Sequence, residues 1–324
     1  MPLRLGNLVL NDLVIQSPLA GFSDLAFRLI GREKGMEFAF LEMVSANALV
    51  LKNKRTLDYL KTVPEDRPLG AQLVGCEPEI MGEAAAAIED MRFDLLDLNL
   101  GCPVRKVTAL GAGAALLTEP AKAEAVFKSV MKSVKNIPVT VKMRKGYADE
   151  SGDEAVEMAK IAEACGISAV AIHGRTRAAG YSSRSDPGVI ARAKAAVKIP
   201  VIGNGDVMSG PDAVRLREQT GCDAVMLGRG GMGNPWIYAE VARALRGEDG
   251  RSAPPGADEI RETLLRHFDL KLRHQAERVA VLEMRQIAGQ YAKGLPDAAG
   301  FRSRMHGVSG VAEARRVIQE FFRS

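Results

Sequence analysis

Short, mostly apolar runs rich in β-branched residues alternate along this chain with longer stretches in which apolar residues recur at helical spacing. The apolar runs predict eight strands, at residues 13–17, 37–41, 69–74, 95–99, 138–143, 169–173, 200–203 and 224–228. Runs of this kind are typical of strands that are covered on both faces. The pattern therefore favours a sheet that lies inside the molecule.

The stretches between the strands predict helices, among them residues 78–91, 120–134, 153–165, 187–196 and 211–219. Four prolines stand where the first turn of such a helix would begin, the position that proline favours: Pro78, Pro120, Pro187 and Pro211. Strand–helix units repeated in this way predict parallel strands, and eight units can close into a barrel. We therefore expect an α/β fold of the (β/α)8 barrel type.

The alternation stops after a helix that begins near Asn234. Residues 247–256 are rich in Gly, Pro and Ser and predict a linker. The remaining residues carry no strand signal, and they predict helices at 258–276, 279–293, 296–305 and 311–322. The expected domains are thus a catalytic barrel (residues 1–246), the linker (247–256) and a small all-α C-terminal domain (257–324).

Composition excludes several classes of protein. Of the 324 residues, 47% are hydrophobic and 26% are charged, which excludes disordered, collagen-like and coiled-coil chains. No apolar run approaches the roughly 20 residues that span a bilayer. The first residues lack the apolar core of a signal peptide, so we expect a cytoplasmic protein without membrane contact. The net charge of +4 permits a nucleic-acid partner without establishing one.

The four cysteines show no metal-binding spacing, and no metal site is expected; they are Cys76, Cys102, Cys165 and Cys222. Cys102 stands between Gly101 and Pro103 just past a strand end, which predicts a place on an exposed loop. A thiol with a pKa of about 8.5 is mostly protonated at neutral pH and suits a proton donor. The other three cysteines are interpreted as packing residues.

Functional groups of a βα barrel gather at the C-terminal ends of its strands. Glycine-rich segments, 203–205 and 228–231, end two neighbouring predicted strands, where glycine lets backbone N–H groups approach an anion. Together they predict a phosphate site, with tight turns as the alternative. Lys142 points toward the same mouth as His173, and a core lysine destabilises a fold unless it meets an anion or an electron-rich group. The alternatives are a lysine that reaches solvent and a histidine that is hydrogen-bonded in the core.

These residues lie in segments that resemble the tRNA-dihydrouridine synthases, most closely the bacterial B-type branch. The segments are Pro18-Leu19-Ala20-Gly21-Phe22-Ser23-Asp24, Gln72-Leu73, Asn99-Leu100-Gly101-Cys102-Pro103, Val141-Lys142-Met143-Arg144, His173-Gly174-Arg175-Thr176-Arg177, Gly203-Asn204-Gly205-Asp206 and Gly228-Arg229-Gly230. They follow one another through the whole barrel. A weaker match in the C-terminal domain covers Met284-Arg285 and Tyr291-Ala292-Lys293-Gly294-Leu295.

The resemblance implies an oxidoreductase that uses FMN and NADPH to reduce the C5–C6 double bond of D-loop uridine in tRNA. Hydride would pass from reduced FMN to C6, and Cys102 would give the proton to C5. The residues implied to bind FMN are Pro18, Leu19, Ala20, Gln72, Lys142, His173, Asn204, Gly205, Asp206, Gly228 and Arg229. The same resemblance implies a monomer.

For the tRNA, the resemblance implies a helical domain that binds RNA and a uracil extruded from the folded substrate. Asn99 would hold the extruded base. Basic residues that would contact the RNA are Arg105, Lys106, Arg144, Arg175 and Arg177 around the mouth, with Arg285 and Lys293 in the C-terminal domain. A solvated helix face is the alternative for the last two. Gln290 and Ile287 depart from the residues common in this family and leave the mode of RNA binding open.

Three other functions fit parts of the pattern. One is an FMN barrel reductase of a free small molecule, similar to dihydroorotate or dihydropyrimidine dehydrogenases, against which the helical tail and Arg105-Lys106 argue. Another is a flavin-free lyase or isomerase that uses Lys142 as a Schiff base. The third is a non-catalytic RNA-binding protein.

Overall fold

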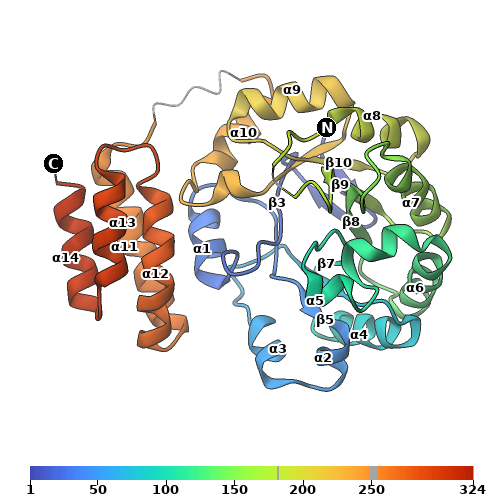
Figure 1. The fold of residues 1–324 in the computed structure, drawn as a ribbon, viewed down its shortest axis with the longest axis horizontal. Coiled ribbons are helices and arrows are strands. Elements are labelled where there is room, and N and C mark those ends of the chain that lie inside the picture. Colours follow the sequence, from blue (N-terminus) through green and yellow to red (C-terminus); the bar gives the residue numbers. More distant parts are fainter. Residues whose placement is uncertain (181, 249–253, 324) are drawn as a thin grey trace.

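The computed structural model describes residues 1–180, 182–248 and 254–323, and it contains a closed barrel of parallel strands surrounded by helices (Figure 1). The strands of the barrel are β3 (Val14–Gln16), β4 (Ala39–Phe40), β6 (Leu69–Val74), β7 (Leu95–Leu100), β8 (Val139–Gly146), β9 (Ala169–Thr176), β10 (Val201–Asn204) and β11 (Ala224–Leu227). Each pairs in parallel with its neighbours, and the pairing of β4 with β6 closes the barrel. The predicted (β/α)8 fold is confirmed.

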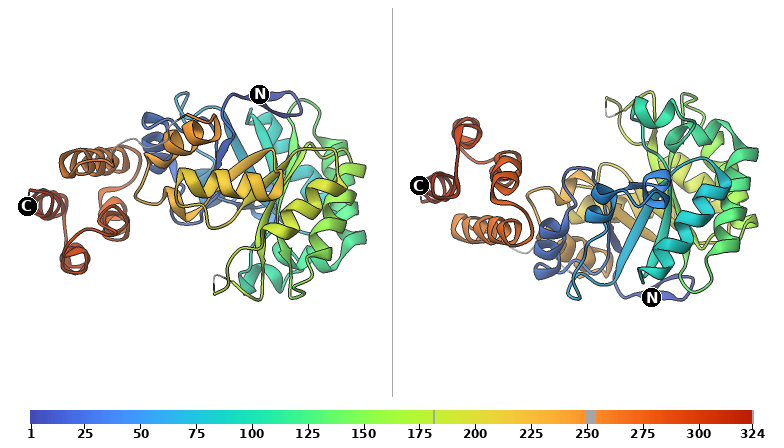
Figure 2. Two further views of the ribbon diagram at one scale, coloured as in Figure 1. Left: turned by 90° about the horizontal axis from the view of Figure 1, so that it is seen from above. Right: turned by 90° about the horizontal axis from the view of Figure 1, so that it is seen from below.

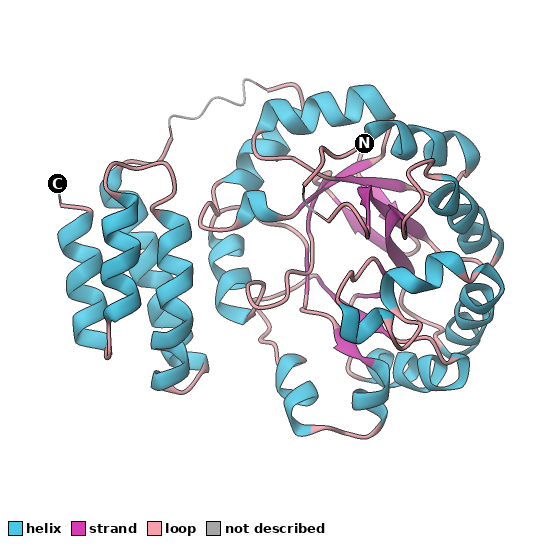
Figure 3. Cartoon of the chain, viewed as in Figure 1, coloured by secondary structure: helices cyan, strands magenta, loops and turns pink. Residues whose placement is uncertain are grey.

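Helices cover the outside of the barrel (Figure 3). They are α1 (Leu25–Glu33), α4 (Pro78–Asp90), α6 (Pro120–Ser133), α7 (Asp153–Ala164), α8 (Pro187–Ala196), α9 (Gly210–Thr220) and α10 (Ile237–Leu245). Each helix that was predicted between strands begins and ends within one residue of its prediction. Proline occupies the first turn of α4, α6, α8 and α9, as its fixed φ angle favours.

Several short elements were not predicted. An antiparallel hairpin of β1 (Leu3–Leu5) and β2 (Leu8–Leu10) precedes the barrel, and β5 (Val44–Ser45) extends the sheet beside β6. Short helical segments lie in the loops: α2 (Ala46–Val50), α3 (Lys54–Tyr59), α5 (Arg105–Thr108), and the 3-10 turns η1 (Gly113–Thr118) and η2 (Arg229–Gly231).

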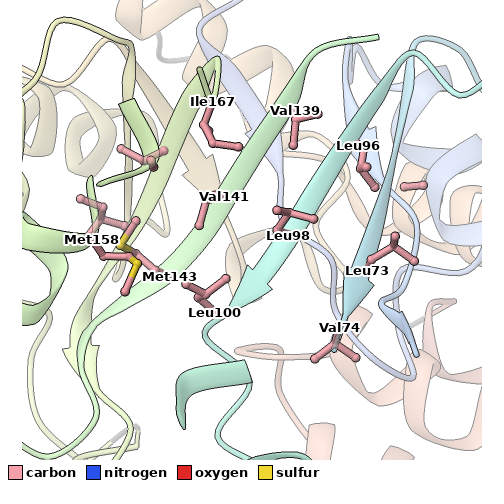
Figure 4. Packing of buried hydrophobic residues seen from close by; sticks show 14 of the residues in the cluster. Leu73, Val74, Leu96, Leu98, Leu100, Val139, Val141, Met143, Met158 and Ile167 are labelled. Atoms are coloured by element: carbon pink, nitrogen blue, oxygen red, sulfur yellow. The ribbon is translucent and has the colours of Figure 1, made fainter. Parts of the chain in front are cut away.

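Two apolar layers hold the barrel together. The outward-facing residues of the strands pack against the helices, and Figure 4 shows Val141 and Met143 of β8 on this side with Met158 of α7. Inside the barrel, Ile15 and Ala171 pack with Leu5 of the hairpin and form an apolar floor. Toward the C-terminal ends of the strands the interior becomes polar. The barrel is therefore apolar at its floor and charged at its mouth.

The C-terminal domain is a group of helices beside the barrel (Figures 1 and 2). They are α11 (Ala257–His274), α12 (Glu277–Tyr291), α13 (Ala298–Gly307) and α14 (Val311–Phe321), and they enclose a core of their own. Helix α11 packs against α1 of the barrel. The predicted linker, 247–256, falls between α10 and α11, and its residues 249–253 lie outside the described residues.

Within the described ranges, no helix is both long and apolar enough to cross a membrane.

Candidate active site

A cavity of about 420 Å³ opens at the C-terminal ends of the barrel strands. It brings together every residue that was predicted to bind the cofactor, together with Cys102 and three of the predicted substrate residues. Those lining residues are Pro18, Leu19, Ala20, Gln72, Asn99, Cys102, Lys142, Arg144, His173, Arg175, Asn204, Gly205, Asp206, Gly228 and Arg229. The structure therefore brings these residues together in one cavity at the barrel mouth.

The register of the parallel strands explains this convergence. Asn99 of β7 stands beside Lys142 of β8, and His173 of β9 stands between Arg144 of β8 and Asn204 of β10. Residues at matching heights on neighbouring parallel strands point to the same side of a sheet. Residues that lie more than 100 positions apart in the sequence therefore line one ring inside the barrel.

One end of the cavity holds a cluster of charged side chains from β9, the loop after β10, and η2. Arg175 donates from Nη2 to both carboxylate oxygens of Asp206 at 2.7 Å, and Arg229 lies 3.5 Å from the same carboxylate. The Nη1 of Arg175 lies 3.2 Å from Nε2 of His173. Because a guanidinium only donates, Nε2 of His173 accepts and Nδ1 carries the proton.

Burial and neighbouring cations set the ionisation of this cluster. Burial, with the charges of Lys142, Arg144 and Arg175 added to it, lowers the pKa of His173 to about 2, so the imidazole is neutral at physiological pH. Burial alone would raise the pKa of Asp206, but hydrogen bonds from Arg175 and the backbone of Ser185 outweigh it and hold that pKa below its usual range. Asp206 is the one carboxylate among the described lining residues, against four Lys or Arg side chains. The cavity is therefore suited to an anionic ligand.

Glycine leaves room for such a ligand beside the cluster. A Cβ atom added to Gly228 would meet no atom within 4 Å, although Gly228 lines the cavity. Gly205 has a φ of +139°, a conformation that side chains rarely adopt, and an added Cβ would collide with Ser185. The two glycines keep backbone at the cavity surface, where it can approach a phosphate closely.

Lys142 lies deeper in the same cavity. Burial and the charge of Arg144 lower the pKa of its ammonium group to about 8, and Asp97 opposes this shift. Among the residues that the structure describes, none accepts a hydrogen bond from its Nζ. A half-buried cation of this kind is stabilised when an anion or an electron-rich ring fills the space in front of it.

Cys102 is buried, and the prediction of an exposed loop was wrong for it. Its exposed fraction is 7%, because the chain after α5 folds back over the loop and Ala114 donates its N–H to the carbonyl of Cys102 at 3.1 Å. Gly113, with a φ of +62°, makes this close approach possible: an added Cβ would lie 2.9 Å from the same carbonyl. The thiol still lines the cavity, and burial raises its pKa, so it is protonated at neutral pH.

Asn99 and Gln72 hold this wall of the cavity through hydrogen bonds. The Oδ1 atom of Asn99 accepts from the backbone N–H groups of Gly101 at 3.0 Å and Cys102 at 2.8 Å. Its Nδ2 donates to Oε1 of Gln72 at 2.8 Å. Gln72 in turn donates to Asp97, a buried carboxylate that was not predicted to belong to the site. The polar position inside the apolar run 95–100 was the signal that could have revealed it.

The predicted RNA-contacting residues fall into separate groups. Arg105 and Lys106 are exposed on α5, directly after the loop that carries Cys102. Arg144 and Arg175 are buried in the cavity, where Arg144 donates to the carbonyls of Gly101 and Thr176.

The other three lie farther along the chain. The guanidinium of Arg177 lies 5.1 Å from the ring centre of Tyr147. Arg285 donates to the carbonyl of Val308 within the helical domain, and Lys293 is exposed after α12.

The model of the family described as dihydrouridine synthase matches residues 15–324 of this chain. The chain belongs to the dihydrouridine synthase family. A probable tRNA-dihydrouridine synthase of Rickettsia conorii is 34% identical over 323 residues, which cover 99% of this chain and 97% of that protein. The tRNA-dihydrouridine synthase B of Xanthomonas axonopodis is 37% identical over 291 residues, covering 90% of this chain and 86% of the relative.

Solved structures resemble this family member at the level of the fold. Histamine dehydrogenase from Rhizobium sp. 4-9 superposes with a TM-score of 0.57 at 13% identity, covering 88% of this chain and 50% of that one. An old yellow enzyme homologue from Zymomonas mobilis gives a TM-score of 0.52 at 12% identity, covering 76% and 92%. Both likenesses support the barrel assignment.

Proposed function

We propose that this chain is a tRNA-dihydrouridine synthase that uses FMN and NADPH to reduce the C5–C6 double bond of one or more D-loop uridines. The observation that carries the proposal is a single cavity that combines a protonated thiol, the cation of Lys142, which has no hydrogen-bond acceptor among the described residues, and a group of cations beside open glycine backbone. Membership of the dihydrouridine synthase family supports it, as do relatives that carry the name of this enzyme.

The donor set suits a flavin mononucleotide. His173, Arg175 and Arg229, with the backbone at Gly205 and Gly228, would hold the phosphate, and Asn204 and Asp206 would keep this end in shape. Pro18, Leu19 and Ala20 would line the ring, and Gln72 and Lys142 would face its polar edge. When bound, the flavin supplies the hydride chemistry that no side chain can perform. Lys142 would stabilise negative charge at that edge, because none of the described residues accepts a hydrogen bond from its Nζ.

Cys102 supplies the proton in this proposal. Burial keeps its thiol protonated, and the hydrogen bonds from its loop to Asn99 hold the backbone in place. A nucleobase must leave the folded tRNA to reach such a cavity. Asn99 would contact the extruded uracil through the part of its amide that faces the cavity.

The RNA would lie across the mouth and the helical domain, which we propose as the tRNA-binding domain. Phosphate contacts are assigned to Arg105, Lys106, Arg177, Arg285 and Lys293, of which Arg105, Lys106 and Lys293 are exposed. We further propose that the protein acts in the cytoplasm, as a monomer and without a resident metal.

Two measurements on the purified protein test the proposal. Acid release of the bound chromophore, with mass spectrometry, should yield FMN, and NADPH should bleach the absorption of the protein. Unmodified tRNA should then re-oxidise the reduced protein at least about 100-fold faster than free uridine at equal uridine concentration, because binding of the whole RNA contributes to reaching the transition state. Equal rates with both substrates would contradict the proposal and favour a small-molecule reductase.

A further inference from the structure

Asp97 is a buried carboxylate inside the barrel, one inward-facing position below Asn99 on β7. Its side chain is 1% exposed, and no described Lys or Arg forms an ion pair with it. A carboxylate in such a place destabilises the fold unless hydrogen bonds compensate for lost water. An apolar residue would cost less at this depth, which points to a role for the hydrogen bonds that the carboxylate accepts.

Those hydrogen bonds form a chain that leads from Asp97 to the backbone of Cys102. Gln72 donates from Nε2 to Oδ2 of Asp97 at 2.7 Å, and its Oε1 accepts from Nδ2 of Asn99 at 2.8 Å. Oδ1 of Asn99 then accepts from the N–H of Cys102 at 2.8 Å. On the other side, the hydroxyl of Thr140 donates to Oδ1 of Asp97 at 2.6 Å. Every donor in this chain therefore faces toward Asp97.

The two ends of the chain decide how the two amides between them are oriented. An amide side chain keeps its shape when oxygen and nitrogen exchange places, so packing alone does not choose between its two orientations. An ionised Asp97 can only accept, and the backbone N–H of Cys102 can only donate. The observed arrangement of Gln72 and Asn99 is the one that satisfies both ends at once.

We propose that Asp97 is a positioning residue for Cys102, acting through Gln72 and Asn99 to fix the orientation of the Asn99 amide and thereby the loop that carries the thiol. The inference rests on the proposed function, in which Cys102 gives the proton to the substrate. Should Asn99 turn over, its NH2 group would face the N–H groups of Gly101 and Cys102, and the loop would lose both hydrogen bonds. The thiol would then lie away from its place at the cavity wall.

The substitution that tests this is Asp97→Asn, which keeps the shape of the side chain and lets it donate as well as accept. Both orientations of Gln72 and Asn99 then become possible. In single-turnover experiments, we expect re-oxidation of the reduced protein by tRNA to slow about 10- to 100-fold, the effect of misplacing a reacting group by roughly 1 Å. The tRNA concentration for half-maximal rate should change less than about twofold, because the basic residues that are assigned to the phosphates of the RNA are unchanged.

Thr140→Val is the matched control. It removes the other hydrogen bond to the same carboxylate at the same depth, but it leaves the line from Asp97 to Cys102 intact. We expect its re-oxidation rate to stay within about threefold of the unsubstituted protein. A Thr140→Val variant that is as slow as Asp97→Asn would assign Asp97 a purely structural role.

Asp97 also favours the charged form of Lys142, so its loss could act on the cofactor instead. Reduction of the bound flavin by NADPH separates the two routes. An unchanged rate of this step in Asp97→Asn, with slow re-oxidation by tRNA, supports the route through Cys102. Slowing confined to the NADPH step would contradict it.

The decisive background is Cys102→Ala. If Asp97 acts through the thiol, Asp97→Asn should not lower the residual rate of Cys102→Ala any further. A further loss of the same size would overturn the inference. Full activity of Cys102→Ala in the otherwise unchanged chain would instead contradict the proposed function, so the two failures are distinguishable.

If Asp97→Asn does not fold, a double variant that reverses the direction of the hydrogen bonds tests the proposal instead. In Asp97→Asn/Asn99→Asp every hydrogen bond of the chain can form again, with donor and acceptor exchanged at Gln72. Re-oxidation faster than in Asn99→Asp alone supports the proposal. A rate no higher than that of Asn99→Asp contradicts it.

Discussion

The barrel mouth and the helical domain both contain many basic side chains, but the two regions use them differently. In the mouth, Arg144 and Arg175 are buried, and the cavity that they line contains a single carboxylate among its described residues, Asp206. In the helical domain, Arg304 and Arg315 lie near the surface and form ion pairs with Glu320 and Asp269. The register of the parallel strands brings the charged side chains of the mouth together. The charged side chains of the helical domain lie instead along the exposed faces of its helices.

This difference between buried and exposed charges indicates where the protein requires a ligand. Buried charge destabilises a protein unless something compensates for it, while exposed ion pairs contribute little either way. The excess of cations in the mouth therefore indicates a charged ligand at that place. Arg304 and Arg315 of the helical domain are already paired with carboxylates of the same domain, whereas Lys293 is exposed.

Among substitutions at the barrel mouth, removal of the Cys102 thiol should lower the activity most. We expect Cys102→Ala to lower dihydrouridine formation by about 10²- to 10⁴-fold, the contribution of a general acid, while flavin binding and its reduction by NADPH persist. The measurement is single-turnover kinetics of both half-reactions, with Cys222→Ala, buried elsewhere, as the control. Loss of the flavin from Cys102→Ala would assign the residue to cofactor binding instead.

The charged end of the cavity should show the next largest effect. Arg175→Met removes the guanidinium, whose Nη2 donates to both oxygens of Asp206. We expect the affinity for FMN to fall about 10- to 100-fold, because a hydrogen bond to a charged group contributes about 1.5 to 3 kcal/mol. Arg175→Lys keeps the charge without the planar guanidinium, and its affinity for FMN should fall less. Fluorescence titration of the apoprotein measures both, and equal affinities in all three proteins would exclude this end as the phosphate site.

Lys271 tests the comparison of buried and exposed charges within the helical domain, because this cation is buried where the domain meets the barrel. It donates to Asp24 and Glu283 at 2.5 Å each and is 2% exposed. Lys271→Met leaves Asp24 without its cation, and we expect the free energy of unfolding to fall by on the order of 3 kcal/mol. Arg304→Met, which breaks an exposed pair, should lose less than about 1 kcal/mol.

A single tryptophan reports on this contact. Trp236 lies between the domains, hydrogen-bonded to Glu259 and 6.5 Å from the ring of Tyr291. Its fluorescence during urea unfolding measures both variants. Similar losses for Lys271→Met and Arg304→Met would show that burial does not distinguish the two pairs.

Acid should weaken the helical domain through His267. Burial, opposed by Asp24 and aided by Lys271, lowers the pKa of this histidine from 6.5 to about 4. The unfolded chain therefore binds a proton that the folded chain excludes, and stability falls as pH drops from about 6.5 toward 4, by about 1.4 kcal/mol per pH unit. The pKa of His173 is lowered even further in the folded chain, so its protonation in the unfolded chain adds to the same loss, and His267→Phe should remove only part of it.

The exposed His274 on the same helix provides the control for that experiment. Urea unfolding at pH 7.0 and pH 5.0 should give His274→Gln the full loss of stability and His267→Phe a smaller one. An undiminished loss in His267→Phe would mean that other groups cause the acid sensitivity.

The smallest effects should come from single basic residues of the helical domain. Lys293→Gln removes one exposed charge and should weaken tRNA binding a few-fold and reduce its salt dependence by about one ion. Arg285 is already bound to the carbonyl of Val308, so Arg285→Gln should act on stability more than on RNA. Binding measured at several salt concentrations tests this, and a larger RNA effect for Arg285→Gln would contradict it.

The barrel was predictable because many of its helices and strands carry clear sequence features. Proline in the first turn and unbroken apolar strands located α4, α6 and β6 within one residue. The hairpin of β1 and β2 was missed although Gly6, with a φ of +58°, stands at its turn, because strands of three residues give too short a period.

The members of the site were predictable, but their burial and mutual contacts were not. Strand ends identify which residues reach the mouth, whereas the cover over Cys102 comes from η1, which begins eleven residues later in the chain. Asp97 was missed for a related reason. Its partners Gln72 and Thr140 come from two other strands, and only the register of the sheet brings them together.

The most direct test is the dihydrouridine content of tRNA from a strain that lacks this activity, after incubation with the purified protein, FMN and NADPH. The proposed function predicts new dihydrouridine at defined D-loop positions, formed at least about 100-fold more slowly when Cys102→Ala replaces the unsubstituted protein. A protein that binds flavin and oxidises NADPH but leaves the tRNA unchanged would contradict it and make the mouth the site of a small-molecule reductase.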